Sequence, residues 1–79
     1  MPRSAPPPAW VIARRRTIGD HIRTARRAAG LTQEQVALRI GMDRATYNRI
    51  EQGHSAPLID SLILIADALG IELSDLVQT

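Results

Sequence analysis

The chain has 79 residues, a formal net charge of +2 and no cysteine. This length predicts one small domain whose modest core leaves little room for a buried active site, and the lack of cysteine excludes a disulfide framework and a thiolate zinc site. No apolar run approaches the roughly 18 residues of a membrane span, and the N-terminus lacks the apolar stretch of a signal peptide, so we expect a cytoplasmic protein without a membrane part.

The charge is distributed unevenly along the chain. All ten basic residues are arginines and none follows Arg49, so residues 1–53, which also hold four carboxylates, carry a net charge of +6. Residues 54–79 hold four carboxylates and no Lys or Arg, which gives a net charge of −4. This asymmetry favours a polyanionic partner for the N-terminal part, although charge alone fits an ordinary solvated face as well.

Residues 1–16 are predicted to form an N-terminal arm, Pro-rich and then Arg-rich, ahead of a domain over residues 17–79. Residues 1–9 contain four of the five prolines, which favours an extended or disordered segment. Thr17 and Asp20 are spaced as a capping box, and they predict a first helix from about Ile18 to Ala29. Nothing in residues 9–16 forbids a helix, so a start near Ala9 is the alternative.

Two short helices are predicted next, joined by a tight turn at Gly41. Thr32 and Gln35 form a capping box before a helix over residues 33–40, and Asp43 can cap a helix over residues 44–52. Because the connection is so brief, the two helices must cross steeply. This is the helix-turn-helix geometry, which presents the second helix to the major groove of DNA.

A fourth helix is predicted from roughly Leu58 to Leu69, with Pro57 well placed as its first residue. Apolar residues at helical spacing are expected to form its core stripe: Ile59, Leu62, Ile65, Ala66 and Leu69. Leu73, Leu76 and Val77 predict one last short turn of helix. No strand pattern occurs in the sequence, so we expect five short helices in a compact all-α domain.

Several residues and short segments on the predicted helices form a specific signature when they occur together. They are Arg26, GLTQEQVA at 30–37, Gly41, IEQG at 50–53, Pro57 and ADALG at 66–70. Through them the sequence resembles the phage-repressor and Cro-type helix-turn-helix family, also called XRE, from about Ile18 to Leu76. The resemblance implies a five-helix lambda-repressor-like domain whose third helix enters the major groove, usually as part of a dimer on a palindromic site.

The outward face of the predicted third helix is the candidate for base reading. Tyr47 and Ile50 are expected to point inward. The outward residues are then Arg44, Ala45, Asn48 and Arg49. A guanidinium can bind guanine bidentately, an amide can read adenine, and a methyl group can meet the methyl of thymine. We expect the two arginines to be the main base-reading residues, with ordinary solvent exposure as the alternative.

Six further polar residues are expected to contact DNA phosphates: Gln33, Thr46, Gln52, Arg14, Arg15 and Arg16. Gln33 begins the second helix, where free backbone N–H groups bind phosphate, and the family resemblance implies a phosphate-contacting Gln there. The consecutive arginines precede the predicted first helix, where they oppose its dipole, so we expect an arm that grips phosphates or the minor groove. The alternative is that these polar side chains are simply solvated, the arginines as part of a disordered tail.

Other residues are expected to be structural. Arg26 and Glu51 resemble a buried ion pair of the family that ties the first helix to the third. Tyr47 is expected to be a core residue with a solvated hydroxyl. His21 and His54 have no Cys or clustered carboxylates as partners, so neither a metal nor another cofactor is expected.

Apolar residues outside the core stripe of the fourth helix predict a partner surface. Leu58, Ile63 and Leu64 are expected to form a dimer interface with the last helix and the acidic C-terminal part, because a single module reads few base pairs. The apolar segment 10–12 can either cover an edge of the core or join this interface.

The leading functional hypothesis is a sequence-specific DNA-binding transcriptional regulator, a repressor or controller that binds double-stranded DNA as a homodimer. The alternative is an antitoxin-type interaction protein that binds a toxin partner and regulates its own operon. An enzyme is not expected, because the sequence offers neither a nucleophile–base pair nor a metal cluster.

Overall fold

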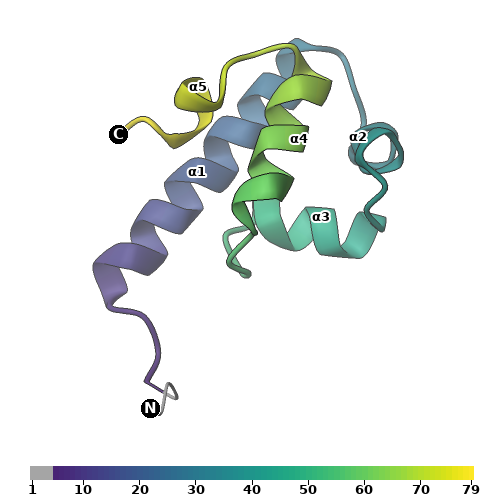
Figure 1. Ribbon diagram of the computed structural model, residues 1–79. Helices are drawn as coiled ribbons and strands as arrows, with labels where there is room; N and C mark the ends of the chain where they lie inside the picture. Colours follow the sequence, from purple (N-terminus) through teal and green to yellow (C-terminus); the bar gives the residue numbers. More distant parts are fainter. Residues whose placement is uncertain (1–4) are drawn as a thin grey trace.

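The computed structural model describes residues 5–79, and the first four residues of the predicted arm lie outside this part. Five helices follow one another in the described residues: α1 (Ala9–Ala28), α2 (Gln33–Ile40), α3 (Arg44–Glu51), α4 (Ile59–Leu69) and α5 (Leu73–Val77) (Figure 1). The described residues form no strand, so the predicted all-α five-helix domain is confirmed. None of these helices is both long and apolar enough to cross a membrane.

The helix-turn-helix segment is set by local hydrogen bonds that the sequence predicted. The Gln35 backbone N–H donates to Thr32 Oγ1 at 3.1 Å, and the Thr32 N–H donates to Gln35 Oε1 at 2.8 Å, which completes the capping box of α2. Gly41 ends α2 with φ of 70°, a left-handed conformation that favours glycine. Only Met42 and Asp43 then separate it from α3, so the two helices cross steeply.

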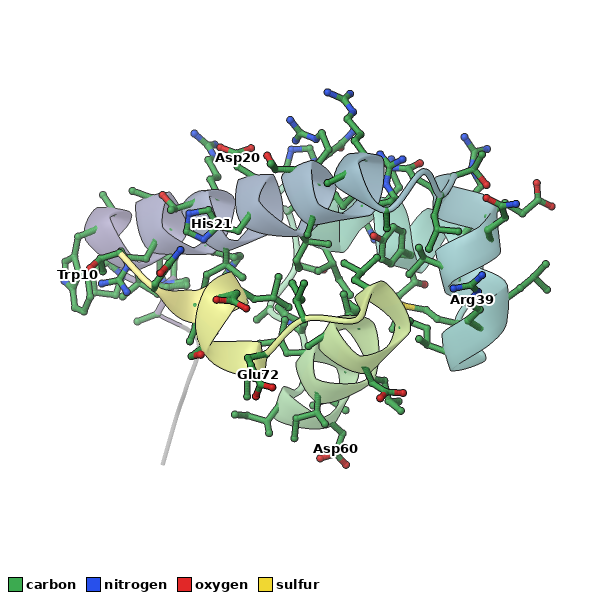
Figure 2. The ribbon with its side chains drawn as sticks, turned by 90° about the horizontal axis from the view of Figure 1, so that it is seen from above. Trp10, Asp20, His21, Arg39, Asp60 and Glu72 are labelled. Atoms are coloured by element: carbon green, nitrogen blue, oxygen red, sulfur yellow. The ribbon has the colours of Figure 1, made fainter. Side chains whose placement is uncertain are left out.

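The first helix begins earlier than its main prediction. It starts at Ala9, directly after Pro8, and runs without interruption through residue 17, so residues 9–16 are helical and the alternative start is the observed one. The expected cap at Thr17 is wrong, because its hydroxyl donates to the Ala13 carbonyl, 3.2 Å away and one turn earlier in the same helix. The first two turns of α1 consequently project beyond the other helices (Figures 1 and 2).

The fourth helix begins slightly later than predicted. Its first residue is Ile59, with Leu58 at the N-cap position, so Pro57 lies in the preceding loop rather than in the helix. No side chain caps this end, because Leu58 has no hydrogen-bonding group. Ile59 was predicted to be a core residue, but its side chain is 64 % exposed because it lies at the end of the helix, where no other element covers it.

Every helix contributes to one apolar core. Its buried members are Ile22, Val36, Ala37, Tyr47, Ile50, Leu62, Ile65, Ala66, Leu69 and Leu76. Helix α4 packs against α1, α2 and α5, while α1 lies along α3 on the other side. His21 Nδ1 of α1 lies 2.9 Å from the Leu76 carbonyl oxygen, which ties α5 to α1. These contacts leave one long side of α3 uncovered.

Candidate nucleic-acid interface

Helix α3 has one buried and one exposed side. Tyr47, Ile50 and Glu51 are buried, as the helical period requires for the side that meets α1 and α2. The predicted base-reading residues lie on the other side: Arg44, Ala45 and Arg49 are exposed and Asn48 is half-buried. The outward face thus has the composition that the sequence predicted.

The two arginines of this face are available for a ligand. Within the described residues, neither Arg44 nor Arg49 has a side-chain hydrogen bond or an ion pair. Arg44 directly follows Asp43, whose carboxylate accepts hydrogen bonds from the Thr46 N–H at 3.2 Å and the Thr46 hydroxyl at 2.6 Å. The Thr46 hydroxyl and N–H lower the pKa of Asp43, so this cap stays ionised.

A side-chain bridge fixes α2 against α3 beside these arginines. The Gln33 amide nitrogen donates to Asn48 Oδ1 at 2.8 Å and to Glu51 Oε1 at 3.1 Å. Both hydrogens of this amide are therefore in use, and the Asn48 oxygen is directed toward Gln33. The amide hydrogens of Asn48 remain for another acceptor. The sequence did not predict this bridge.

The Glu51 carboxylate also holds α1. Arg26 Nε donates to Glu51 Oε2 at 2.7 Å and Arg26 Nη2 to Glu51 Oε1 at 3.2 Å, which makes a bidentate pair. The Glu51 side chain is only 1 % exposed. Burial works to raise the pKa of Glu51, but the hydrogen bonds from Arg26 and Gln33 outweigh it, so the pKa lies below its ordinary value. One carboxylate thus connects α1, α2 and α3.

The hydroxyl of Tyr47 departs from its prediction. It is buried rather than solvated, and it completes no hydrogen bond within the described residues. Burial raises the pKa of Tyr47 far above its usual range, and the nearby Glu51 carboxylate adds to this effect. The Tyr47 side chain is a fully buried member of the core, so its hydroxyl is buried together with the ring.

A polar groove of about 640 Å³ lies beside the bridge, between the end of α1, the start of α2 and Arg44. Arg26 and Arg27 form the α1 side of this groove, and Gln33 and Glu34 form the α2 side. Arg27 was not among the predicted contact residues, although its position three residues before Gly30 places it next to the start of α2. The groove brings three arginines to the N-terminal end of α2, where backbone N–H groups attract anions.

Comparison with protein families shows which family this domain belongs to. Residues 22–76 match the model of the helix-turn-helix family HTH_3, and this range holds all of α2, α3 and α4. The chain belongs to this family. Its members are DNA-binding transcriptional regulators rather than enzymes, and α2 and α3 are the helix-turn-helix pair of this HTH_3 domain.

Curated relatives support the same assignment. The transcriptional repressor RstR of the cryptic phage CTXphi from Vibrio cholerae is 36 % identical over 59 residues, which are 75 % of this chain and 53 % of RstR. An uncharacterized HTH-type regulator, y4dJ of Sinorhizobium fredii, is 35 % identical over 63 residues, 80 % of this chain and 82 % of y4dJ. The chain spans about half the length of RstR but most of y4dJ.

Solved structures share the fold. The restriction-modification controller protein C.AhdI from Aeromonas hydrophila superposes with a TM-score of 0.78 at 33 % identity, over 81 % of this chain and 97 % of C.AhdI. The hypothetical transcription factor NHTF from Neisseria has a TM-score of 0.77 at 23 % identity, over 98 % of this chain and 85 % of NHTF, a likeness of fold.

The remaining predicted contact residues lie elsewhere on the HTH_3 domain. Gln52 is exposed directly after α3. Arg14, Arg15 and Arg16 are part of α1 rather than of an arm ahead of it. The first two line an apolar groove toward the loop before α4, whereas the backbone of Arg16 packs against Gly53 at the end of α3. The structure therefore separates three arginines that the sequence analysis had grouped.

The predicted partner surface on α4 is exposed. Leu58 is 73 % exposed, and Ile63 and Leu64 are each 48 % exposed. Because successive residues are turned by about 100°, Ile63 and Leu64 lie on opposite flanks of the outward line through Asp60 and Asp67. The apolar residues thus surround a line of carboxylates and do not form one continuous apolar stripe.

Proposed function

We propose that this chain is a sequence-specific repressor or controller that binds a palindromic operator as a homodimer, with α3 in the major groove. The observation that carries this proposal is the outward face of α3. Arg44, Ala45 and Arg49 are exposed there, and the Gln33–Asn48–Glu51 bridge holds the helix rigidly beside α2. RstR is named a repressor and C.AhdI a controller protein, which supports both roles.

Each residue of the face has a role that its chemistry suits. Arg44 and Arg49 bind guanine O6 and N7 through their guanidinium groups, and Ala45 contacts a thymine methyl. Asn48 presents its amide hydrogens, because its oxygen faces Gln33, and it reads a purine N7 or another acceptor. The bridge thus selects which half of the Asn48 amide meets the DNA.

Phosphate contacts set the position of α3 in the groove. The side-chain amide of Gln33 is occupied, so the N-terminal end of α2 binds phosphate through backbone N–H groups, with Arg27 and Arg44 across the polar groove. Gln52 and Arg16 contact the phosphate backbone of the DNA beyond the end of α3. The Thr46 hydroxyl donates to Asp43, so a phosphate contact by Thr46 requires its release from that cap.

The dimer places two copies of α3 about 34 Å apart, one helical turn of DNA, on the two halves of the operator. We assign Leu58, Ile63 and Leu64 to the protomer contact, since they are large apolar residues exposed at the N-cap and on the outward side of α4. An antitoxin, the alternative function, would bind DNA through the same face of α3 and would in addition bind a toxin.

Selection of bound DNA from a random pool tests this proposal. We expect a palindromic site, and we expect Arg44→Ala and Arg49→Ala each to cost about 1–3 kcal/mol at particular base pairs and to relax the selection there. Arg39→Ala is the matched control, because Arg39 is an exposed arginine of α2 whose guanidinium reaches back to the Ala68 carbonyl in α4. Selection unchanged by both α3 substitutions contradicts the assignment of the reading face.

A further inference from the structure

An apolar groove of about 270 Å³ lies on the side of α1 that faces the loop before α4. Val11 and Ile18 of α1 form one wall, Pro57 and Leu62 form the opposite wall, and Arg14 and Arg15 stand at its α1 side. Its volume is slightly below the range of about 300–1,000 Å³ that is usual for small-molecule sites. Its size and lining suit a few apolar side chains of a protein with a carboxylate beside them.

The groove exists because α1 is longer than the bundle that it supports. Val11, Arg15 and Ile18 continue the inward face of α1 past the end of its packing partners, and Trp10 at the projecting end is 67 % exposed (Figure 2). The family match begins at residue 22, so this part of α1 lies ahead of the shared domain. In a single copy, this part of the inward face of α1 therefore has no helix packed against it.

The start of α4 has the complementary chemistry. Leu58 and Ile59 are 73 % and 64 % exposed, and Asp60 follows them on the outside of the helix (Figure 2). Residues 54–79 contain no Lys or Arg, so within this segment the carboxylate has no cation to pair with. Two apolar side chains next to a carboxylate match an apolar groove next to two arginines.

The same copy does not make this match. Leu58 directly follows Pro57 of the groove wall, yet its side chain remains exposed. Because the groove and the α4 start are neighbours on one surface, a two-fold axis between them brings each α4 start to the other copy's groove. A closed dimer with two identical contacts results.

We propose that the groove receives the α4 start of a second copy, so that the partner's Leu58 and Ile59 cover Val11 and Ile18 while the partner's Asp60 binds Arg14 and Arg15. This inference rests on the proposed homodimer and specifies how it is held. It assigns Arg14 and Arg15 to protein rather than to DNA, and it gives the α1 extension the role of a dimer clasp.

Charge reversal in trans tests the contact. Arg14→Glu with Arg15→Glu gives one variant, and Asp60→Arg gives the other. In sedimentation equilibrium each variant alone is expected to dimerise about tenfold more weakly than the wild type, because the symmetry repeats every repulsive pair. An equimolar mixture is expected to recover wild-type affinity, since both contacts of the mixed dimer then join opposite charges. Glu34→Arg is the matched control, because this exposed carboxylate lies on α2 at the separate polar groove.

The outcomes separate this inference from the proposed function. If the wild type dimerises and neither variant changes the affinity, the proposed contact is overturned and the dimer has another geometry. Variants rescued only when all three substitutions are in one chain, and not by mixing, overturn a contact between copies. A monomeric wild type overturns the clasp and the homodimer together, while the base-reading test with Arg44 and Arg49 on a single half-site remains independent. Thermal melts of both variants that match the melt of the wild type confirm that the variants are folded.

Discussion

Gly19 of α1 lies directly against the backbone carbonyl of Glu51 in α3. A Cβ atom at Gly19 would approach that oxygen closely and would lie 2.8 Å from the Ile50 carbonyl oxygen. Glycine inside a helix costs about 1 kcal/mol relative to alanine, so its place here has a packing reason. The absence of a side chain lets α1 approach the C-terminal end of α3, and this approach brings Arg26 within reach of the buried carboxylate.

Gly19→Ala is therefore expected to destabilise the domain although it favours the helix. The methyl group meets backbone atoms that cannot rotate away, and overpacking of this kind costs about 1–3 kcal/mol. Urea denaturation measures the change in the free energy of unfolding. Thr24→Ala, at an exposed site of the same helix, serves as the control and is expected to change stability by about 0.5 kcal/mol or less. A Gly19→Ala protein more stable than the wild type would contradict the close packing.

Glu51→Ala is expected to be the most damaging substitution in the helix-turn-helix segment. It removes the acceptor of both Arg26 and Gln33 and leaves the guanidinium, in a side chain only 12 % exposed, without its partner. Loss of one member of a buried pair costs about 3–5 kcal/mol. A thermal melt at neutral pH measures it, and wild-type stability of Glu51→Ala would show that the pair contributes little.

The same carboxylate makes stability depend on acid pH. The folded-state pKa of Glu51 lies below the ordinary glutamate value of about 4.3, so its contribution is complete above that value and is lost as the pH falls through the folded-state pKa. We expect the free energy of unfolding to decline below about pH 4.3, with a shallower decline for Glu51→Gln. Asp43, whose pKa is also lowered, titrates in both proteins, so the difference between their slopes isolates Glu51.

Tyr47→Phe is expected to leave the domain as stable as before or to stabilise it. Its buried hydroxyl has no completed hydrogen bond among the described residues, and such a group costs about 1–3 kcal/mol. The pKa of Tyr47 is raised, so the folded state keeps its full stability below the ordinary tyrosine pKa of about 10 and loses it as the pH rises further. Tyr47→Phe should remove that alkaline loss. Clear destabilisation by this substitution in urea would indicate a hydrogen bond to the hydroxyl.

Local chemistry explains how much of the fold the sequence could predict. Caps and turns depend on residues a few positions apart, so Thr32, Gln35, Gly41 and Asp43 located α2 and α3 almost to the residue. The spacing of Thr17 and Asp20 is the same signal, yet it did not start a helix, because the preceding residues were already helical. A cap motif is compatible with a helix start and does not require one.

Tertiary geometry decided the features that the sequence did not predict. The period of α4 suited burial of Ile59, but no element reaches that end of the helix. The consecutive arginines 14–16 looked alike as a run, whereas the helix directs Arg14 and Arg15 to one groove and Arg16 to the end of α3. The hydrogen bond from Gln33 to Asn48 joins side chains 15 positions apart, which no local pattern encodes.

That hydrogen bond leads to the last prediction, a coupling between a positioning residue and a base-reading one. Gln33→Ala frees the Asn48 amide to rotate, and Asn48→Ala removes it, so each is expected to weaken operator binding. In a double-mutant cycle followed by fluorescence anisotropy, the two losses should be non-additive by about 0.5–3 kcal/mol, because the second substitution has no oriented amide left to disturb. Gln52→Ala is the control, because the loss of a phosphate contact weakens binding to all DNA sequences alike. Strict additivity of Gln33→Ala and Asn48→Ala would mean that the bridge does not orient the reading amide on DNA.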